Sequence, residues 1–208
     1  MVNGRRRRQR FAAALPSIRQ LDTSEDNSTS KKEKLVVNRY VTLMFAATFA
    51  CTCTLQAQNA NPLSTEAKQA YTVIKNNLLK MADKMPEEHY GFKPVPEIRT
   101  FGQLVAHVAD SQARTCSAVN GEQKAVNAAS KTSKADLVAA LKESFAICDV
   151  AYDSLTDAAA AEMIKTARGQ RSKLGALVGV TTHDNEEYGY MAVYLRLKGV
   201  VPPSSEGR

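Results

Sequence analysis

The chain has 208 residues, a formal net charge of +7 at pH 7 and 44% hydrophobic residues. The basic surplus lies in the first 57 residues, which hold 10 Lys+Arg and 4 Asp+Glu, whereas residues 58–208 hold 18 Lys+Arg and 17 Asp+Glu. A nearly neutral remainder without a basic stripe excludes nucleic-acid binding by an electrostatic patch, and its length of about 150 residues suits one domain.

Residues 31–57 have the features of a secretory signal peptide. Four basic residues precede an apolar stretch at 40–55, which has the length of a signal-peptide core and is short for a membrane span. Leu55-Gln56-Ala57 is an acceptable cleavage site. We therefore expect a leader at 1–57, a domain at 58–208, export to the periplasm or beyond, and no stable membrane span after cleavage.

Alternatives to this leader stay open. The apolar stretch could remain uncleaved as an anchor, or a lipid could be attached at Cys51, although Phe49 fits a lipidation signal poorly. Residues 1–30 are long for such a leader, and a start codon assigned too far upstream would explain them equally well.

The first predicted helix covers about residues 64–85. Its apolar residues recur at spacings of three and four, which indicates one buried face: Ala67, Tyr71, Ile74, Leu78, Met81 and Met85. Pro86 ends this helix, and the glycine and prolines that follow it predict an extended connection.

Three further helices follow. Thr100 with Gln103 predicts a capping box that starts a helix at about 101–119, which Asn120-Gly121 ends. Ser133 with Asp136 starts a third helix that reaches about Leu155. Residues 156–173 are expected to form a loop or a short helical piece, and residues 174–197 the fourth helix. Nothing alternates like a strand, so the prediction is an all-α, four-helix bundle.

Three side chains could form a metal site. His183 and Glu187 are one turn apart on the fourth helix and point the same way, and His107 lies beside the apolar face of the second helix. Two imidazoles and a carboxylate suit Zn, Ni, Mn or Fe. A histidine and a glutamate at this spacing are also common as a solvated pair, and a lone histidine is often a core residue, so spacing alone leaves both interpretations open.

The sequence resembles the DinB/YfiT-like family over most of residues 62–205. The resemblance rests on Phe92-Lys93-Pro94, on the stretch RTFGQLVAHVA at 99–109, on HDNEEYG at 183–189, and on YLRLKG at 194–199 followed by Pro202-Pro203-Ser204. It implies a four-helix fold and a divalent metal held by one histidine of the second helix and two, four apart, on the last. These positions map onto His107, His183 and Glu187.

Glu187 departs from this family pattern, which has histidine there. A carboxylate still coordinates metals, with a different preference, or the metal has been lost. Some members of the family carry out thiol-dependent transfer or isomerisation, and members often form dimers, so the resemblance makes a homodimer one expectation for this chain. Asp184 would either orient His183 or face solvent, and Glu186 would face solvent.

Two cysteines remain after the predicted cleavage, Cys116 and Cys148. In an oxidising compartment they could form a disulfide between the second and third helices, and otherwise they are two buried small residues. No histidine lies near either one in the helical pattern, which disfavours a nucleophilic thiol.

Three functions therefore remain in view. The first is a metal-dependent hydrolase or transferase that acts on an unidentified small molecule, with no catalytic residue and no organic cofactor site recognised. The second is a noncatalytic exported bundle that binds a metal or a partner. The third is a family member that has lost its metal. A reachable site with an open coordination position would favour the first, and an outward Glu187 the third.

Overall fold

The computed structural model describes residue 36, residues 60–167 and residues 169–207. From residue 60 onwards the described residues belong to one unit, Asn59–Arg208. The leader predicted at 1–57, its cleavage site and Cys51 lie outside the described residues, apart from Val36.

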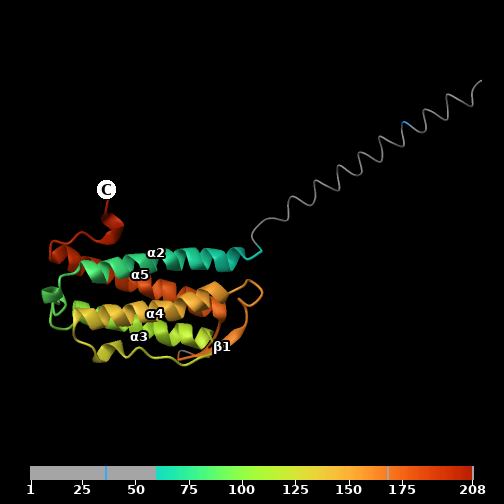
Figure 1. The fold of residues 1–208 in the computed structure, drawn as a ribbon, viewed down its shortest axis with the longest axis horizontal. Coiled ribbons are helices and arrows are strands. Elements are labelled where there is room, and N and C mark those ends of the chain that lie inside the picture. The colour runs from blue at the N-terminus through green and yellow to red at the C-terminus, as the bar shows by residue number, and fades with distance from the viewer. Residues whose placement is uncertain (1–35, 37–59, 168, 208) are drawn as a thin grey trace, which may run out of the picture. The chain divides into compact units, whose positions relative to one another are not determined.

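Four long helices build the domain, as predicted (Figure 1). They are α2 (Pro62–Lys84), α3 (Phe101–Val119), α4 (Lys134–Ser154) and α5 (Lys173–Leu197). α3 packs against α4 and α5, and α2 packs against the same two helices. Short 3-10 helices lie in the connections, at η2 (Glu87–His89), η3 (Ala128–Ser130) and η4 (Pro203–Ser205). The four-helix bundle is therefore confirmed.

Local caps set most of the helix starts. Thr100 accepts a hydrogen bond from Gln103 N while the Gln103 side chain accepts one from Thr100 N, which is the predicted capping box of α3. Ser133 caps α4, and Ser172 caps α5 by accepting from Gly175 N. These hydroxyls satisfy backbone donors that a helix leaves unpaired at its first turn.

A distant carboxylate caps α2 instead. Asp157 lies beyond the end of α4, and its two carboxylate oxygens accept from Leu63 N and Ser64 N at 3.0 and 2.8 Å. In return Asn61 Oδ1 accepts from Asp157 N at 2.8 Å. Burial acts to raise the pKa of Asp157, but the hydrogen bonds from Ser64 and Leu63 outweigh it and hold this pKa below its ordinary value. The start of α2 is thus tied to the segment that follows α4.

An aromatic pair fills the core between α2, α4 and α5. Tyr71 stacks on Tyr152 with ring centroids 3.9 Å apart and planes 8° apart. The Tyr152 hydroxyl donates to Leu177 O and also lies 2.8 Å from Thr181 Oγ1. Buried tyrosines keep their hydroxyls hydrogen-bonded, and here the bonds attach α4 to α5 one turn before the candidate site.

A β-hairpin replaces part of the loop expected at 156–173. β1 (Met163–Thr166) pairs antiparallel with β2 (Gly169–Ser172), in a register that places Ile164 opposite Arg171. Gly169 has φ +101°, a conformation that favours glycine, at the start of β2. Among the described residues of the hairpin, only Ile164 packs against the core. The strands therefore carry no alternation of apolar residues from which to predict them. The hairpin contacts both α3 and α5.

A disulfide joins α3 to α4. Cys116 and Cys148 are both fully buried, and their Cα atoms lie 4.9 Å apart. The disulfide considered for this pair is therefore confirmed in the structure, and the alternative of two separate buried thiols is not observed.

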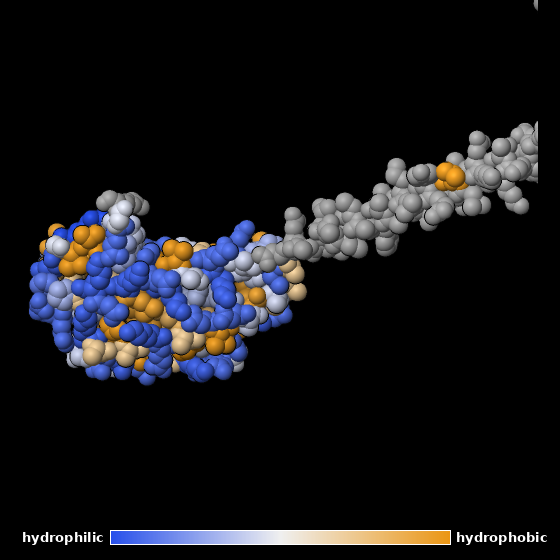
Figure 2. Space-filling model, turned by 45° about the horizontal axis from the view of Figure 1, so that its top comes forward, coloured by the Kyte–Doolittle hydropathy of each residue, from blue (hydrophilic) through white to orange (hydrophobic). Residues whose placement is uncertain are grey.

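Hydrophilic side chains cover much of the surface seen in Figure 2, with apolar groups between them. Within the described part of the chain, no helix combines the length and the apolar character needed to cross a membrane.

Candidate metal centre

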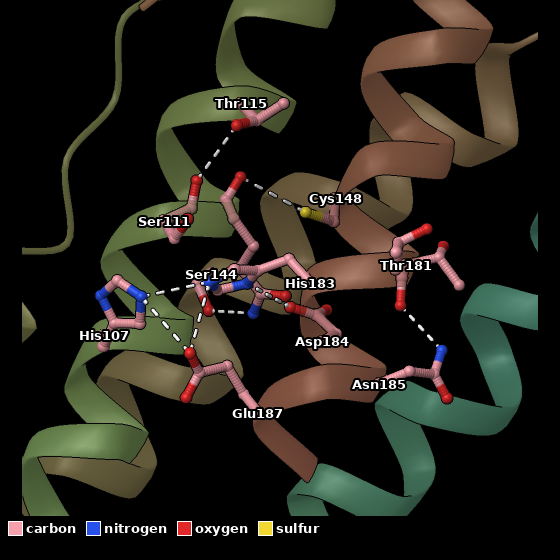
Figure 3. A network of polar contacts seen from close by, with 12 residues as sticks. His107, Ser111, Thr115, Ser144, Cys148, Thr181, His183, Asp184, Asn185 and Glu187 are labelled. Carbon is pink, nitrogen blue, oxygen red and sulfur yellow. Dashed lines mark hydrogen bonds and ion pairs between the residues drawn. The ribbon is translucent and has the colours of Figure 1, made fainter. Parts of the chain in front are cut away.

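α3 and α5 bring the three predicted ligands together (Figure 3). His107 Nε2 and His183 Nε2 lie 3.1 Å apart. Glu187 Oε1 lies 3.6 Å from His107 Nε2 and 3.7 Å from His183 Nε2. One ligand atom from each residue thus falls within 4.8 Å of the other two, and the group could hold a metal ion.

The spacing of these atoms fits a shared ion. Ligands at about 2.0–2.2 Å from one ion lie roughly 3.0–3.6 Å from each other in octahedral or tetrahedral geometry. Two of the three observed separations, 3.1 and 3.6 Å, fall within that range, and the third, 3.7 Å, lies just above it. Glu187 Oε2 is buried without a hydrogen-bond partner. An unpaired buried carboxylate oxygen is costly, and a cation at this point would compensate it.

The centre is open on one side. The His107 side chain is 35% exposed, whereas those of His183 and Glu187 are 16% and 6% exposed. His183 lines a cavity of about 270 Å³ between α3, the hairpin and α5. His107 lines another of about 610 Å³ beside α3 and the segment after η3. Small molecules can therefore approach both histidines.

The helical repeat of α5 explains why Glu187 turns inward. Buried residues recur along α5 at spacings of three and four, and the set includes two acids: Leu177, Val180, Asp184, Glu187, Met191 and Tyr194. Glu187 therefore lies on the core-facing stripe, and His183 lies at its edge. His107 occupies the matching edge of α3, beside Leu104 and Val108.

Asp184 is fully buried, so it does not face solvent. Its Oδ1 lies 3.5 Å from His183 Nδ1, which places the carboxylate where it can orient that imidazole. Its Oδ2 has no hydrogen-bond partner. Glu186, in contrast, is exposed as expected, and its carboxylate accepts a hydrogen bond from the Tyr190 hydroxyl.

Two buried polar residues near the centre, Gln112 and Ser144, were not predicted from the sequence. The Gln112 amide donates to Ser144 Oγ, and Gln112 Oε1 is buried without a partner. A signal for Gln112 existed, because it continues the spacing of Val105 and Val108 towards Cys116 on the buried face of α3. A polar residue on such a stripe indicates either a network or a site.

Burial raises the pKa of Glu187 above its ordinary value, although His183 and Arg99 oppose the shift. Burial also raises the pKa of Asp184, against the hydrogen bond and the charge of His183. Both carboxyls lose hydration on folding, which disfavours their charged forms. At a pH between the ordinary and the raised pKa values, Asp184 and Glu187 are therefore more protonated in the metal-free folded protein than in the unfolded chain.

We expect these two acids to make metal-free protein less stable as the pH rises. Their folded pKa values exceed the unfolded ones, so their contribution is fully present below the ordinary carboxyl range and is lost as the pH rises through the raised values. Urea unfolding of metal-free protein across this window would show it. The Asp184→Asn, Glu187→Gln double variant should have a flatter profile than wild type, and an unchanged profile would contradict the expectation.

Comparisons with known proteins agree with this architecture. The pattern of the DinB superfamily matches residues 70–191, more than half of the chain. The curated proteins contain no match. Among solved structures, a DinB-like protein from Bacillus cereus ATCC 10987 superposes with a TM-score of 0.60 at 17% identity, over 70% of this chain and 98% of that one.

Two other structures are also similar. The DinB-like protein YjoA from Bacillus subtilis has a TM-score of 0.51 at 19% identity, over 64% of this chain and 92% of that one. A mycothiol-dependent maleylpyruvate isomerase has a TM-score of 0.50 at 18% identity, over 63% of this chain and 60% of its own length. At these identities the likeness concerns the fold. Because the family pattern matches most of the helical domain, the chain belongs to the DinB superfamily.

Proposed function

We propose that this protein is an exported metal-dependent enzyme, of hydrolase or transferase type, that acts on a small molecule. His107, His183 and Glu187 would hold a divalent ion between α3 and α5. The observation that carries the proposal is the convergence of these three side chains, with ligand atoms within 4.8 Å of one another, at the edge of two cavities.

The donor set suits Zn, Ni, Mn or Fe, because imidazole and carboxylate ligands are acceptable to all four. When bound, such an ion acts as a Lewis acid and lowers the pKa of a coordinated water or thiol. Glu187 brings a negative charge, and Asp184 would hold the His183 ring with Nε2 turned to the ion. The exposed side of His107 leaves room for a substrate.

The position of Glu187 supports this function over the two alternatives. A family member that had lost its metal would be free to turn this carboxylate to solvent, but Glu187 is 5% exposed and faces both histidines. A metal that only stabilised the fold would be enclosed, but cavities reach His107 and His183. Both observations favour a reactive centre.

Hydrolysis is the better supported of the two reaction types. One similar structure is an isomerase that depends on mycothiol, so a thiol-dependent reaction is the competing candidate. However, the Cys116–Cys148 disulfide supports an oxidising compartment. Reduced low-molecular-weight thiols are scarce in such compartments, which favours water as the attacking group.

The disulfide also supports the proposal of export. Sequencing the N-terminus of protein recovered from the periplasm tests it directly. Export with cleavage after Ala57 gives a chain that begins at Gln58, whereas recovery of the uncleaved chain from the cytosol would contradict it.

Elemental analysis of the full-length chain, purified without a histidine tag or a chelator, tests whether the protein binds a metal ion. We expect close to one equivalent of Zn, Ni, Mn or Fe, removable by a chelator and restored by adding the ion. Absence of metal both as purified and after each of the four ions is added would overturn the proposal. Metal without turnover of hydrolytic or thiol-transfer substrates would instead leave a noncatalytic metal-binding bundle.

A further inference from the structure

The cavity beside His183 has an unusual charge. It measures about 270 Å³, and the residues that line it include Arg114 from α3 and Arg171 from β2. Among its described lining residues, none is acidic. Two guanidinium groups therefore share one small cavity with a candidate metal ligand and with no carboxylate to balance them.

Neither guanidinium is neutralised by the described part of the protein. No ion pair or hydrogen bond joins the side chain of Arg114 or Arg171 to another described residue. Asp110, one turn before Arg114, accepts from Ala128 N and Ala129 N instead. Both arginines are exposed to solvent, so the repulsion between them is weak, but their guanidinium donors remain available to an anion in this cavity.

The Arg171 side chain lies against a glycine of α5. A Cβ added at Gly179 would lie 3.0 Å from Arg171 Nη1, so the guanidinium rests against bare helix backbone. Gly179 is four residues before His183, and these two positions share a helix face. The hairpin thus lays Arg171 along the face of α5 that presents His183.

Arg114 extends the positive surface towards His107. It lies seven residues after His107, two turns along the same face of α3. Arg114 also lines the cavity of about 610 Å³ that contains His107, together with Arg99, Lys131 and one acid, Asp110. Both approaches to the candidate centre are therefore lined by more basic than acidic side chains.

We propose that Arg114 and Arg171 bind the anionic end of the substrate, a carboxylate or a phosphate, and place the rest of the molecule towards His183. The statement that this anion belongs to the substrate of a reaction rests on the proposed function. A guanidinium donates two parallel hydrogen bonds to the oxygens of either group. The cavity volume of 270 Å³ suits the end of a small molecule.

Anion binding by metal-free, full-length protein tests this inference. Malonate and inorganic phosphate would serve as probes in calorimetric titrations at low salt, with malonamide as the uncharged counterpart of malonate. We expect at least one anion to bind and malonamide not to bind. Binding of malonate alone would assign a carboxylate, and binding of phosphate alone a phosphate. Failure of both anions to bind at millimolar concentration would overturn the inference.

Matched variants separate a built site from general charge attraction. Arg114→Gln and Arg171→Gln should each weaken anion affinity about tenfold or more, since each removes charged hydrogen bonds. Lys142→Gln removes one positive charge from an exposed position on α4 outside both cavities and should change affinity less than twofold. Equal losses in Lys142→Gln and the arginine variants would overturn the inference.

Metal content, measured on the same preparations before the metal is removed, keeps the two proposals distinct. Arginine-dependent anion binding by a protein that holds no metal would support the anion site and overturn the metal-dependent function. Stoichiometric metal with anion affinity unchanged in both arginine variants would overturn the anion site alone.

Discussion

Replacing Glu187 with glutamine is expected to lower divalent-metal affinity by more than a hundredfold. The substitution keeps the size of the side chain and removes the negative charge, and an amide oxygen is a much weaker ligand for these ions. Loss of a residue that only orients a ligand costs about 10- to 100-fold, so loss of a direct ligand should exceed that. The Glu187 carboxylate faces both histidines and is nearly inaccessible to water.

Competition with a fluorescent chelator would measure the affinity. Glu186→Gln is the matched control, because it makes the same change at the neighbouring, solvent-facing carboxylate, and it should leave affinity unchanged. Glu187→His, which restores the ligand type implied by the family resemblance, should retain tight binding with an altered preference among ions. Equal affinities for wild type and Glu187→Gln would remove Glu187 from the site.

Removing the disulfide is expected to lower the free energy of unfolding by about 3–4 kcal/mol. The cross-link closes a chain segment with a sequence separation of 32 residues between Cys116 and Cys148. It restricts the unfolded chain, and its loss restores that freedom. The Cys116→Ala, Cys148→Ala double variant would be compared with wild type by urea unfolding.

Reductant provides the control for this comparison. Wild-type protein should lose most of the same stability when dithiothreitol is added, whereas the double variant should not respond. A wild-type protein whose unfolding is insensitive to reductant would mean that the cross-link does not contribute to stability.

The helices could be predicted closely because their signals are local. α3 occupies Phe101–Val119 as expected, since Thr100 and Gln103 set its start and Asn120-Gly121 its end. α2 begins two residues before the expected Ser64, because its capping carboxylate, Asp157, lies about 93 residues away in sequence. A helix cap supplied by a residue so distant in sequence leaves no signal near the start of the helix.

The hairpin could not be predicted for a related reason. Each strand has four residues. Exposed and partly buried positions alternate in β1, but its two apolar residues, Met163 and Ile164, are adjacent, so the residue types do not alternate with burial. The hairpin instead contacts α3 and α5, and such tertiary contacts cannot be read from the sequence of the strands. Without the hairpin, Arg171 has no evident relation to His183, and the basic cavity was therefore missed.

The candidate ligands were found because histidine is rare in this chain, with three in all, and two lie on periodic helices. Asp184 was harder to place, because an acid beside a histidine is common on exposed helices. Its place on the repeat of Leu177, Val180 and Met191 indicates burial. That pattern was available in the sequence.

The reciprocal contact between Asn61 and Asp157 sets a boundary for trimming of the chain. An aminopeptidase that removes residues one at a time would leave both contacts in place until it reached Asn61. Loss of Asn61 would free Asp157 N, and loss of Leu63 and Ser64 would free its carboxylate. The segment that leads from α4 into the hairpin would then be released at its start. Degradation from this end would therefore loosen the segment that leads towards Arg171 as soon as the first turn of α2 was lost.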